Sequence, residues 1–230
     1  MILFFSIHLF GGVLTVMCYY LALKINKEIR LPFLNPVLMA IVLIITFLFI
    51  SNIDFTDYKV GASYLEMFLA PSVVAMGVFL HERFNEIKKR LKIFVCAVFF
   101  GGISGIISMV LFLLFLDTPQ ILIQSLAAKS VTTPIAIEIT KLLGGLPEIT
   151  AGMVILVGIF GNVFGTSFLM GLGIRDEAAI GTALGTAAHG IGTARAFEIG
   201  EVAGVYSGLA MCLNGIITSI LTPYVLDWFL

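Results

Sequence analysis

The sequence has 230 residues, of which 60% are hydrophobic and only 12% are charged. Soluble globular domains are about a quarter charged, so this composition excludes an ordinary soluble domain and indicates an all-α polytopic membrane protein. The 13 basic and 14 acidic side chains leave a net charge of −1. This balance offers no basic surface for nucleic acid, and no nucleic-acid partner is expected.

The apolar runs predict about eight membrane segments within one transmembrane domain, residues 1–230. A spanning helix needs roughly 20 apolar residues, and such runs lie near 3–23, 33–51, 61–80, 92–116, 121–141, 149–170, 176–194 and 202–226. The first run has no basic stretch before it and no small-residue cleavage site, so we interpret it as a membrane helix and not as a removed signal.

Two loops, residues 24–30 and 81–92, are rich in Lys and Arg. Because cytoplasmic loops collect basic residues, eight crossings would place both loops in the cytoplasm and both termini outside. On that count Lys141 and Arg195 share the cytoplasmic face, and Arg175 lies on the opposite one. A seventh segment that enters and returns would instead move the C-terminus to the cytoplasm.

Residues 69–80 and 127–139 form a weak internal echo, since each places Ser-Val in an apolar run beside a proline. Corresponding interrupted segments in two halves of a membrane protein are typical of transporter binding sites. Two inverted repeats would account for this echo.

The fifth segment carries the motif KSVTTPIAIEI at residues 129–139. Proline removes a backbone donor and disfavours helix at the preceding residue, so the segment should break around Thr132–Pro134 and restart with Pro134 in its first turn. We therefore expect an interrupted or re-entrant helix near 129–139. The free N–H groups and positive dipole end of the new helix favour a carboxylate. Thr132 and Thr133 add hydroxyls, and Ser130 and Lys129 complete the polar cluster. The alternative is a structural kink with Lys129 extended to the membrane surface.

The seventh segment carries GTALGTAAHGIGTARAFE at residues 181–198. In a continuous helix, one face holds a polar stripe made of Thr182, Thr186, His189 and Thr193. Gly190 and Gly192 flank His189 and loosen the helix there. Because irregular backbone at membrane depth survives only inside protein or beside a water-filled cavity, we expect an interrupted or re-entrant helix near 181–195.

Close helix packing is the alternative explanation of this glycine-rich stretch. It accounts less well for His189 and Arg195, because ionisable groups inside a membrane usually face a pathway or a partner. Arg195 could equally anchor a cytoplasmic end. The candidate coupling or charge partners are Lys129, Glu138, Asn162, Arg195 and Asn214, for which interhelical hydrogen bonding is the competing account. Glu138 is buried if the fifth segment spans the membrane.

Motifs of enzymes are absent: the sequence contains no phosphate-binding P-loop, no GxSxG and no HExxH. The three cysteines lie far apart without metal-ligand spacing. We therefore expect no enzyme, no catalytic residue, no cofactor and no metal site.

Four stretches together closely resemble the LrgB family, also called the CidB/LrgB or antiholin-like family. They are the 129–139 motif, GTALGTAAHGIGTARAFEIGEVAGVYSGLAM, NGIITSILTP, and FLAPSVVAMGVFL, which is similar to the family's LGPATVALAVPLY. The resemblance covers nearly the whole chain. Ala70, Gly77 and Phe79 depart from the family pattern, which weakens the case for a paired proline break in the first half.

The resemblance implies a multi-pass protein of the bacterial inner (plasma) membrane that works with an LrgA-type partner in a homo- or hetero-oligomer. It implies one of two functions. One is a transporter subunit for small monocarboxylates such as pyruvate, glycolate, glycerate or 3-hydroxypropionate. The other is a holin/antiholin-like regulator of murein hydrolase export and envelope permeability.

The polar groups and the resemblance together favour the transporter, with a small organic anion as ligand. The predicted substrate-binding residues are Ser130, Thr132, Thr133, Pro134, Thr186, His189, Gly190, Gly192 and Thr193. His189 is predicted to contact substrate or to couple transport to protons, because its reference pKa lies near neutrality.

Overall fold

The computed structural model describes residues 2–29, 36–68, 71 and 84–230, and within these ranges it contains helices and no strands. Its contacts group the chain into two compact units, Met1–His81 and Glu82–Leu230. In the described part of the chain, four helices are long and apolar enough to cross a membrane: Leu9–Glu28, Lys88–Phe115, Pro147–Gly171 and Glu201–Phe229. A shorter apolar helix spans Pro36–Ile50. The prediction of an all-α polytopic membrane protein is therefore confirmed.

The first unit contains α1 (Ile2–Ile29), α2 (Pro36–Ile50) and α3 (Phe55–Glu66). The α1 helix packs on α2 through Cys18, Ala22 and Ala40. It approaches α3 closely at Gly11, where an added Cβ would collide with the Tyr58 carbonyl. This glycine lets the two backbones meet, as small residues do between membrane helices.

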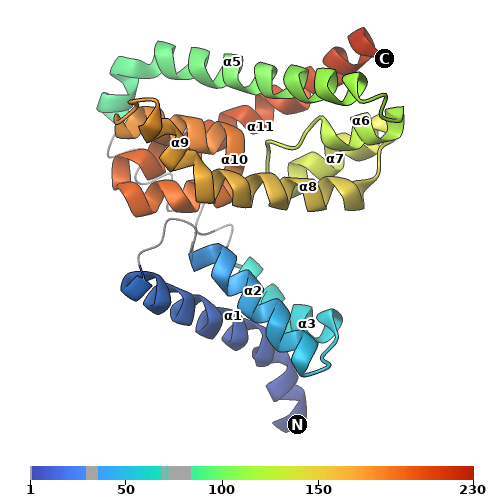
Figure 1. Ribbon diagram of the computed structural model, residues 1–230, viewed down its shortest axis with the longest axis vertical. Coiled ribbons are helices and arrows are strands. Elements are labelled where there is room, and N and C mark those ends of the chain that lie inside the picture. The colour runs from blue at the N-terminus through green and yellow to red at the C-terminus, as the bar shows by residue number, and fades with distance from the viewer. Residues whose placement is uncertain (1, 30–35, 69–70, 72–83) are drawn as a thin grey trace. The chain divides into compact units, whose positions relative to one another are not determined.

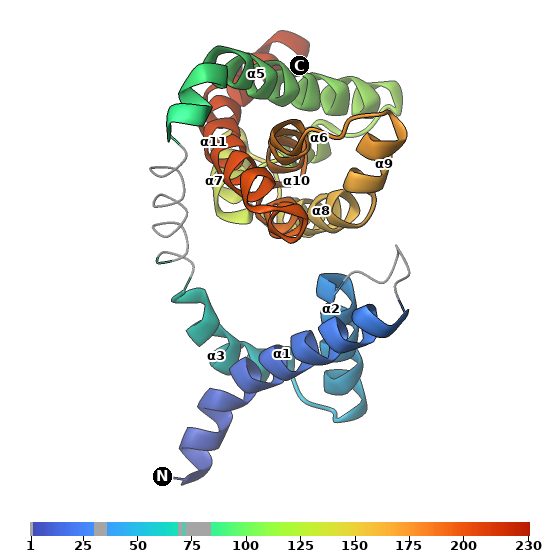
Figure 2. The ribbon, with the colours of Figure 1, turned by 90° about the vertical axis from the view of Figure 1, so that its left-hand side faces the viewer.

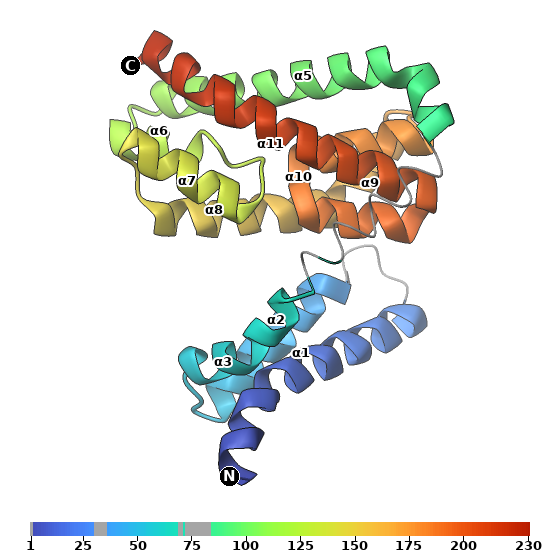
Figure 3. The same cartoon turned by 180° about the vertical axis from the view of Figure 1, so that it is seen from behind.

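Three long helical paths frame the second unit (Figure 1). They are α5 (Phe84–Phe115), the continuous path of α8 (Pro147–Phe160), the π-helix η1 (Gly161–Gly165) and α9 (Thr166–Gly171), and α11 (Glu201–Phe229). The α5 and α11 helices run in the same direction and cross at an angle (Figure 3), since Phe94 stacks edge-on against Tyr206 near one end and Leu113 packs with Leu226 near the other.

The fifth predicted segment forms a hairpin of α6 (Gln120–Leu126) and α7 (Thr133–Leu143). Residues 127–132 make the turn, and Pro134 sits in the first turn of α7 as the sequence predicts. After α7 the chain returns to α6, where the Leu146 N–H donates to Ser125 Oγ at 2.7 Å. The hairpin therefore enters the unit and leaves at the same end, and its tip lies inside (Figure 1).

The seventh predicted segment, α10 (Glu177–Ile199), is a second hairpin. It breaks at His189, which has φ 42° and ψ −134°. A straight helix of this length would separate its ends by about 34 Å, yet a Cβ added to Gly200 would touch the Glu177 carboxylate, and Ile180 shares a cluster with Ala196. Residues 177–188 and 190–199 are therefore two arms folded together, surrounded by α5, α8, α9 and α11 (Figure 2).

These two hairpins correct the predicted placement of two basic residues. Asp176 pairs with Arg90 at 3.0 Å, so the neighbouring Arg175 lies at the end of the unit where α5 begins. Lys141 lies on the returning arm of the first hairpin, toward the end where α5 finishes. The opposite assignment was wrong because it assumed that the fifth and seventh segments cross. Two returning segments cancel, so α11 still ends opposite the start of α5.

The inverted-repeat hypothesis stays a prediction. Apart from Pro71, the echo segment 69–80 lies outside the described residues.

Candidate functional site

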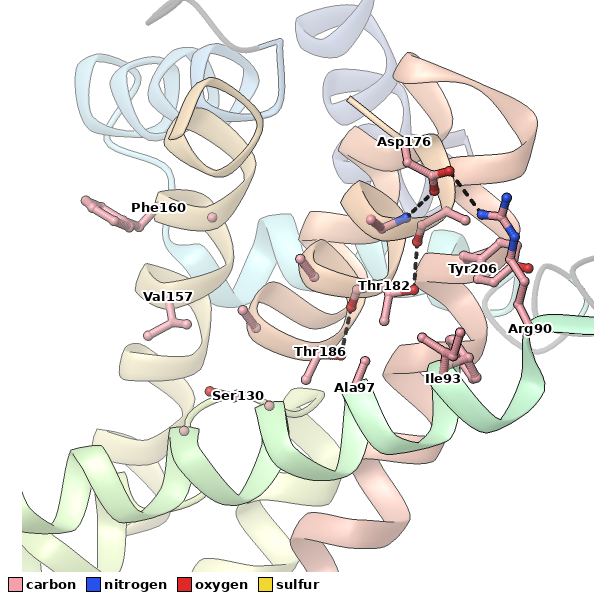
Figure 4. Close-up of a pocket in the computed structure, with 18 of the residues that line it drawn as sticks. Arg90, Ile93, Ala97, Ser130, Val157, Phe160, Asp176, Thr182, Thr186 and Tyr206 are labelled. Atoms are coloured by element: carbon pink, nitrogen blue, oxygen red, sulfur yellow. Dashed lines mark hydrogen bonds and ion pairs between the residues drawn. The ribbon is translucent and has the colours of Figure 1, made fainter. Parts of the chain in front are cut away.

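The second unit contains a cavity of about 600 Å³ bounded by α5, α8, the first arm of α10 and the tip of the first hairpin (Figure 4). Besides Arg90 and Phe94, its α5 wall contains residues spaced four apart, Ile93, Ala97, Gly101 and Gly105. This spacing places them on one helical face. Because three of them are small, the other elements approach closely and still leave room for a ligand.

Charged groups lie at both ends of the cavity. Arg90 and Asp176 lie at one end and Ser130 lies at the other (Figure 4). Lys129, which also lines the cavity, bonds to Ser130 there. A Cβ added to Gly105 would lie 3.8 Å from Ser130 Oγ, so the two ends are separated by the 15 residues of α5 between Arg90 and Gly105, or about 22 Å. The cavity thus runs from one end of the unit to about its middle.

Lys129 is half-buried and donates one hydrogen bond, to Ser130 Oγ at 3.1 Å. Among the described residues no carboxylate forms an ion pair with it. An ammonium group buried without a counter-charge is costly. The inner end of the cavity therefore favours an anion.

The hydroxyls along the α10 wall have their protons directed into the helix. Thr182 donates to the Ala178 carbonyl and Thr186 donates to the Thr182 carbonyl, both at 2.7 Å. Ser130 Oγ accepts from Lys129, which leaves its own proton for a ligand. Lys129 and Ser130 are thus the donors of this wall and tip that can serve a carboxylate.

Asn214 of α11 ties the two hairpins together. Its side-chain amide donates to the Thr186 carbonyl at 2.9 Å and to the Ser130 carbonyl at 3.2 Å, and its oxygen accepts from Thr218 at 3.4 Å. The residue is 1% exposed. One buried amide therefore sets the spacing of the two tips beside Lys129.

The Thr132–Pro134 break forms where the sequence predicts it, but these residues do not line this cavity. Thr132 is the N-cap of α7, its side chain makes no capping bond, and its carbonyl accepts from the Ala136 N–H at 2.9 Å. The structure brings Lys129, Ser130 and Thr186 into the cavity and leaves Thr132, Thr133 and Pro134 on the returning arm behind them.

The predicted polar stripe of the seventh segment divides at the turn. Thr182 and Thr186 face the cavity, whereas His189 is 4% exposed and its Nε2 lies 3.0 Å from the Val154 carbonyl of α8. Thr193 donates to the His189 carbonyl at 2.8 Å and lies 2.9 Å from a serine of α11. A continuous helix would have aligned all four, and the reversal at His189 separates them.

The two glycines around this turn have different surroundings. A Cβ added to Gly192 would lie 2.6 Å from the Leu184 carbonyl, so a side chain there would push the two arms apart. At Gly190 the nearest atom to an added Cβ is the sulfur of Met211, at 3.8 Å. Gly192 serves the folding of the hairpin, and neither glycine lines this cavity.

The other predicted partners bond outside the cavity. Asn162, in the π-helix, donates to the Ile191 carbonyl at 2.7 Å and so holds the returning arm of α10. Arg195 and Glu138 each pair with a residue three positions along the same helix, at 2.6 Å and 2.7 Å. The Glu138 side chain is 69% exposed. It is not buried, because the fifth segment turns back instead of spanning.

Sequence reasoning missed the pair at the cavity mouth. Asp176 caps α10 by accepting from the Ala179 N–H at 3.0 Å, and an Asp before a helix start is a recognisable signal. Arg90 was counted only as part of a basic loop. The hydrogen bond from Arg90 and, with a smaller effect, the one from the Ala179 N–H lower the pKa of the Asp176 carboxyl below its ordinary value.

Comparison with known proteins finds one family model and several bacterial relatives that match nearly the whole chain. Residues 15–228 match the model of the LrgB-like family. The chain is 35% identical to protein YxaC of Bacillus subtilis over 216 residues, which covers 94% of each chain. It is 31% identical to the holin-like protein CidB of Staphylococcus aureus over 216 residues, again 94% of each. No solved structure matches this chain significantly.

Proposed function

This chain belongs to the LrgB-like family, and we propose that it is a transporter subunit for small monocarboxylates. The alternative function that the family resemblance implies is holin-like control. The substrates would be acids such as pyruvate, glycolate, glycerate or 3-hydroxypropionate. The observation that carries the proposal is the half-buried Lys129, without a carboxylate partner among the described residues, at the inner end of the cavity.

The composition of the cavity supports one carboxylate per ligand. The donor groups at its inner end are one ammonium and one hydroxyl, from Lys129 and Ser130. The adjoining walls are apolar or small, with Val157 and Phe160 on α8 and Ala183 and Ala187 on α10. A second carboxylate would lie against these walls without a partner, at a high desolvation cost.

The two hairpins support the transport proposal. Re-entrant backbone at membrane depth is tolerated where it lines a cavity, and interrupted helices that meet near the midplane are typical of secondary transporters. Here the first hairpin enters from the end where α5 finishes and the second from the end where α5 begins. Their tips meet at Asn214.

The test is uptake of labelled pyruvate and glycolate into proteoliposomes, with and without an LrgA-type partner. Lys129→Met should weaken substrate affinity about 10- to 150-fold, because a hydrogen bond to a charged group is worth about 1.5–3 kcal/mol. Lys141→Met is the matched control, since Lys141 lies on the same hairpin but is exposed and paired with Glu138. Saturable uptake that Lys129→Met leaves unchanged would contradict the proposal.

The names of relatives such as the holin-like protein CidB favour a second candidate, in which the chain controls envelope permeability as a holin-like oligomer. Such a protein needs contacts between copies and no anion site. It predicts leakage that does not saturate with substrate and does not depend on Lys129. Efflux of a neutral dye from the same proteoliposomes separates the two functions.

A further inference from the structure

The mouth of the cavity holds an ion pair that the transport proposal does not use. Arg90 Nη1 donates to Asp176 Oδ2 at 3.0 Å, and the two side chains are 58% and 51% exposed. Both residues line the same cavity that reaches Lys129 (Figure 4). An anion that enters from this end passes Arg90 before it reaches Lys129.

Asp176 has two separate bonds, one from each carboxylate oxygen. Oδ2 accepts from Arg90, while Oδ1 accepts from the Ala179 N–H and caps the first arm of α10. The bond to Arg90 can therefore exchange without uncapping the helix. Exposed ion pairs of this kind change an equilibrium by a factor of only about 1.4 to 5, so an incoming carboxylate can compete for the guanidinium.

We propose that Arg90 is the entry site for the substrate carboxylate and that Asp176 is a built-in competitor that occupies it between substrates. The inference rests on the proposed function and adds to it a first contact at the mouth. A substrate carboxylate replaces Asp176 on Arg90 and then moves about 22 Å along the α5 wall to Lys129 and Ser130.

The charges around the mouth support this competition. The hollow beside it is lined by two basic and two acidic side chains, Lys89, Arg90, Asp176 and Glu177. The charges of these four described side chains sum to zero, so together they attract anions weakly. Neutralising Asp176 leaves an excess positive charge, and neutralising Arg90 leaves an excess negative charge, at the same place.

The test measures entry of anions without requiring transport. In a variant with Cys18, Cys96 and Cys212 replaced, Ala187→Cys places one thiol on the cavity wall. The modification rate of this thiol is compared for a sulfonate-bearing and a neutral methanethiosulfonate. Asp176→Asn should raise the rate with the anionic reagent about 1.4- to 5-fold, and Arg90→Gln should lower it by a similar factor. The neutral reagent should react unchanged.

The controls separate entry from folding. Asn caps helices as well as Asp does, so Asp176→Asn keeps the α10 cap. Lys92→Gln removes a neighbouring positive charge of α5 that lines a different hollow, and it should leave the rates nearly unchanged. Equal changes with both reagents, or an effect of Lys92→Gln as large as that of Arg90→Gln, would overturn the entry site.

Uptake by the same variants distinguishes this inference from the proposed function. Charge-selective labelling together with no saturable uptake in the parent protein would support the entry site and refute monocarboxylate transport. Saturable uptake without charge-selective labelling would support monocarboxylate transport and refute the entry site.

Discussion

Replacing Asn214 tests whether one amide holds the two hairpin tips together. Asn214→Asp keeps the size of the side chain and removes both N–H donors, which reach the Thr186 and Ser130 carbonyls. Interhelical hydrogen bonds in membranes average about 0.6 kcal/mol and reach about 1.7. Losing two such bonds lowers the free energy of unfolding by about 1.2 kcal/mol, with a ceiling near 3.4 kcal/mol, and Asn214→Asp adds to this the cost of a buried carboxylate that faces two carbonyl oxygens. Asn214→Leu removes the same two bonds without adding a charge, so it should fall in the range for the two bonds alone.

The assay is unfolding in bicelles or mixed micelles, with uptake affinity measured on the same preparations. Thr218→Val is the matched control, because its hydroxyl makes only the long 3.4 Å bond to the Asn214 oxygen, and it should cost less than about 0.6 kcal/mol. Both Asn214 variants should also weaken substrate affinity, since the tip that carries Lys129 and Ser130 is then no longer held beside Thr186 of the second hairpin. Wild-type stability of Asn214→Asp, or an equal loss in Thr218→Val, would refute the tie.

Three further predictions concern the α10 hairpin and its surroundings. Gly185→Ala should destabilise the protein by about 1–3 kcal/mol, because the new Cβ collides with the Ser207 carbonyl. Gly152→Ala, with nothing within 4 Å, should stabilise it by about 0.5–1 kcal/mol, and thermal unfolding compares the two. Because the pKa of Asp176 is lowered in the folded protein, its pairing with Arg90 contributes to stability above about pH 3.9 and is lost only as the pH falls through the lowered pKa. Uptake by wild type and by Asp176→Asn should therefore show parallel pH profiles between about pH 5 and 8. His189→Asn should yield more folded protein than His189→Val by size-exclusion chromatography, because Asn tolerates the positive φ of 42° and a β-branched residue does not.

The break in the first hairpin could be predicted from the sequence because proline acts locally. Pro134 fixes its own φ and restricts Thr133, and α7 begins there for that reason. What the residues before it do could not be predicted in this way. The return of the chain depends on the contact of Leu146 with Ser125, which lies 21 residues earlier.

The reversal at His189 was harder to predict, because the local preference opposes it. A φ of 42° with ψ of −134° suits glycine at the first central position of a type II′ turn. Here histidine adopts that conformation. The flanking glycines predicted an interrupted or re-entrant helix, but they did not predict that the reversal occurs at His189 itself. The contact of Gly192 with the first arm, which fixes the reversal, is tertiary.

The sequence predicts those residues of the candidate site that lie beside local helix breaks, and it does not predict those that only the tertiary fold brings together. Lys129, Ser130 and Thr186 share the cavity, since each lies on or just before a break that the sequence marks. His189 was predicted to face a pathway by extending a helical stripe through a point where the helix stops. Arg90 and its partner lie 86 residues apart, and no local pattern relates them.

The packing beyond the tips shows which part must move if an anion is to cross. On the side of Lys129 away from the cavity, the first hairpin packs into an apolar cluster that includes Ile123 of α6, Val110 of α5 and Leu226 of α11. An anion at Lys129 can leave toward that end only if the hairpin separates from this cluster. Of the two bonds from Asn214, the one to Ser130 is the longer, at 3.2 Å against 2.9 Å, and it is the one that this separation stretches. If transport follows this route, the amide stays with the second hairpin and releases the first, and the first hairpin, which carries Lys129, is the element that would have to move.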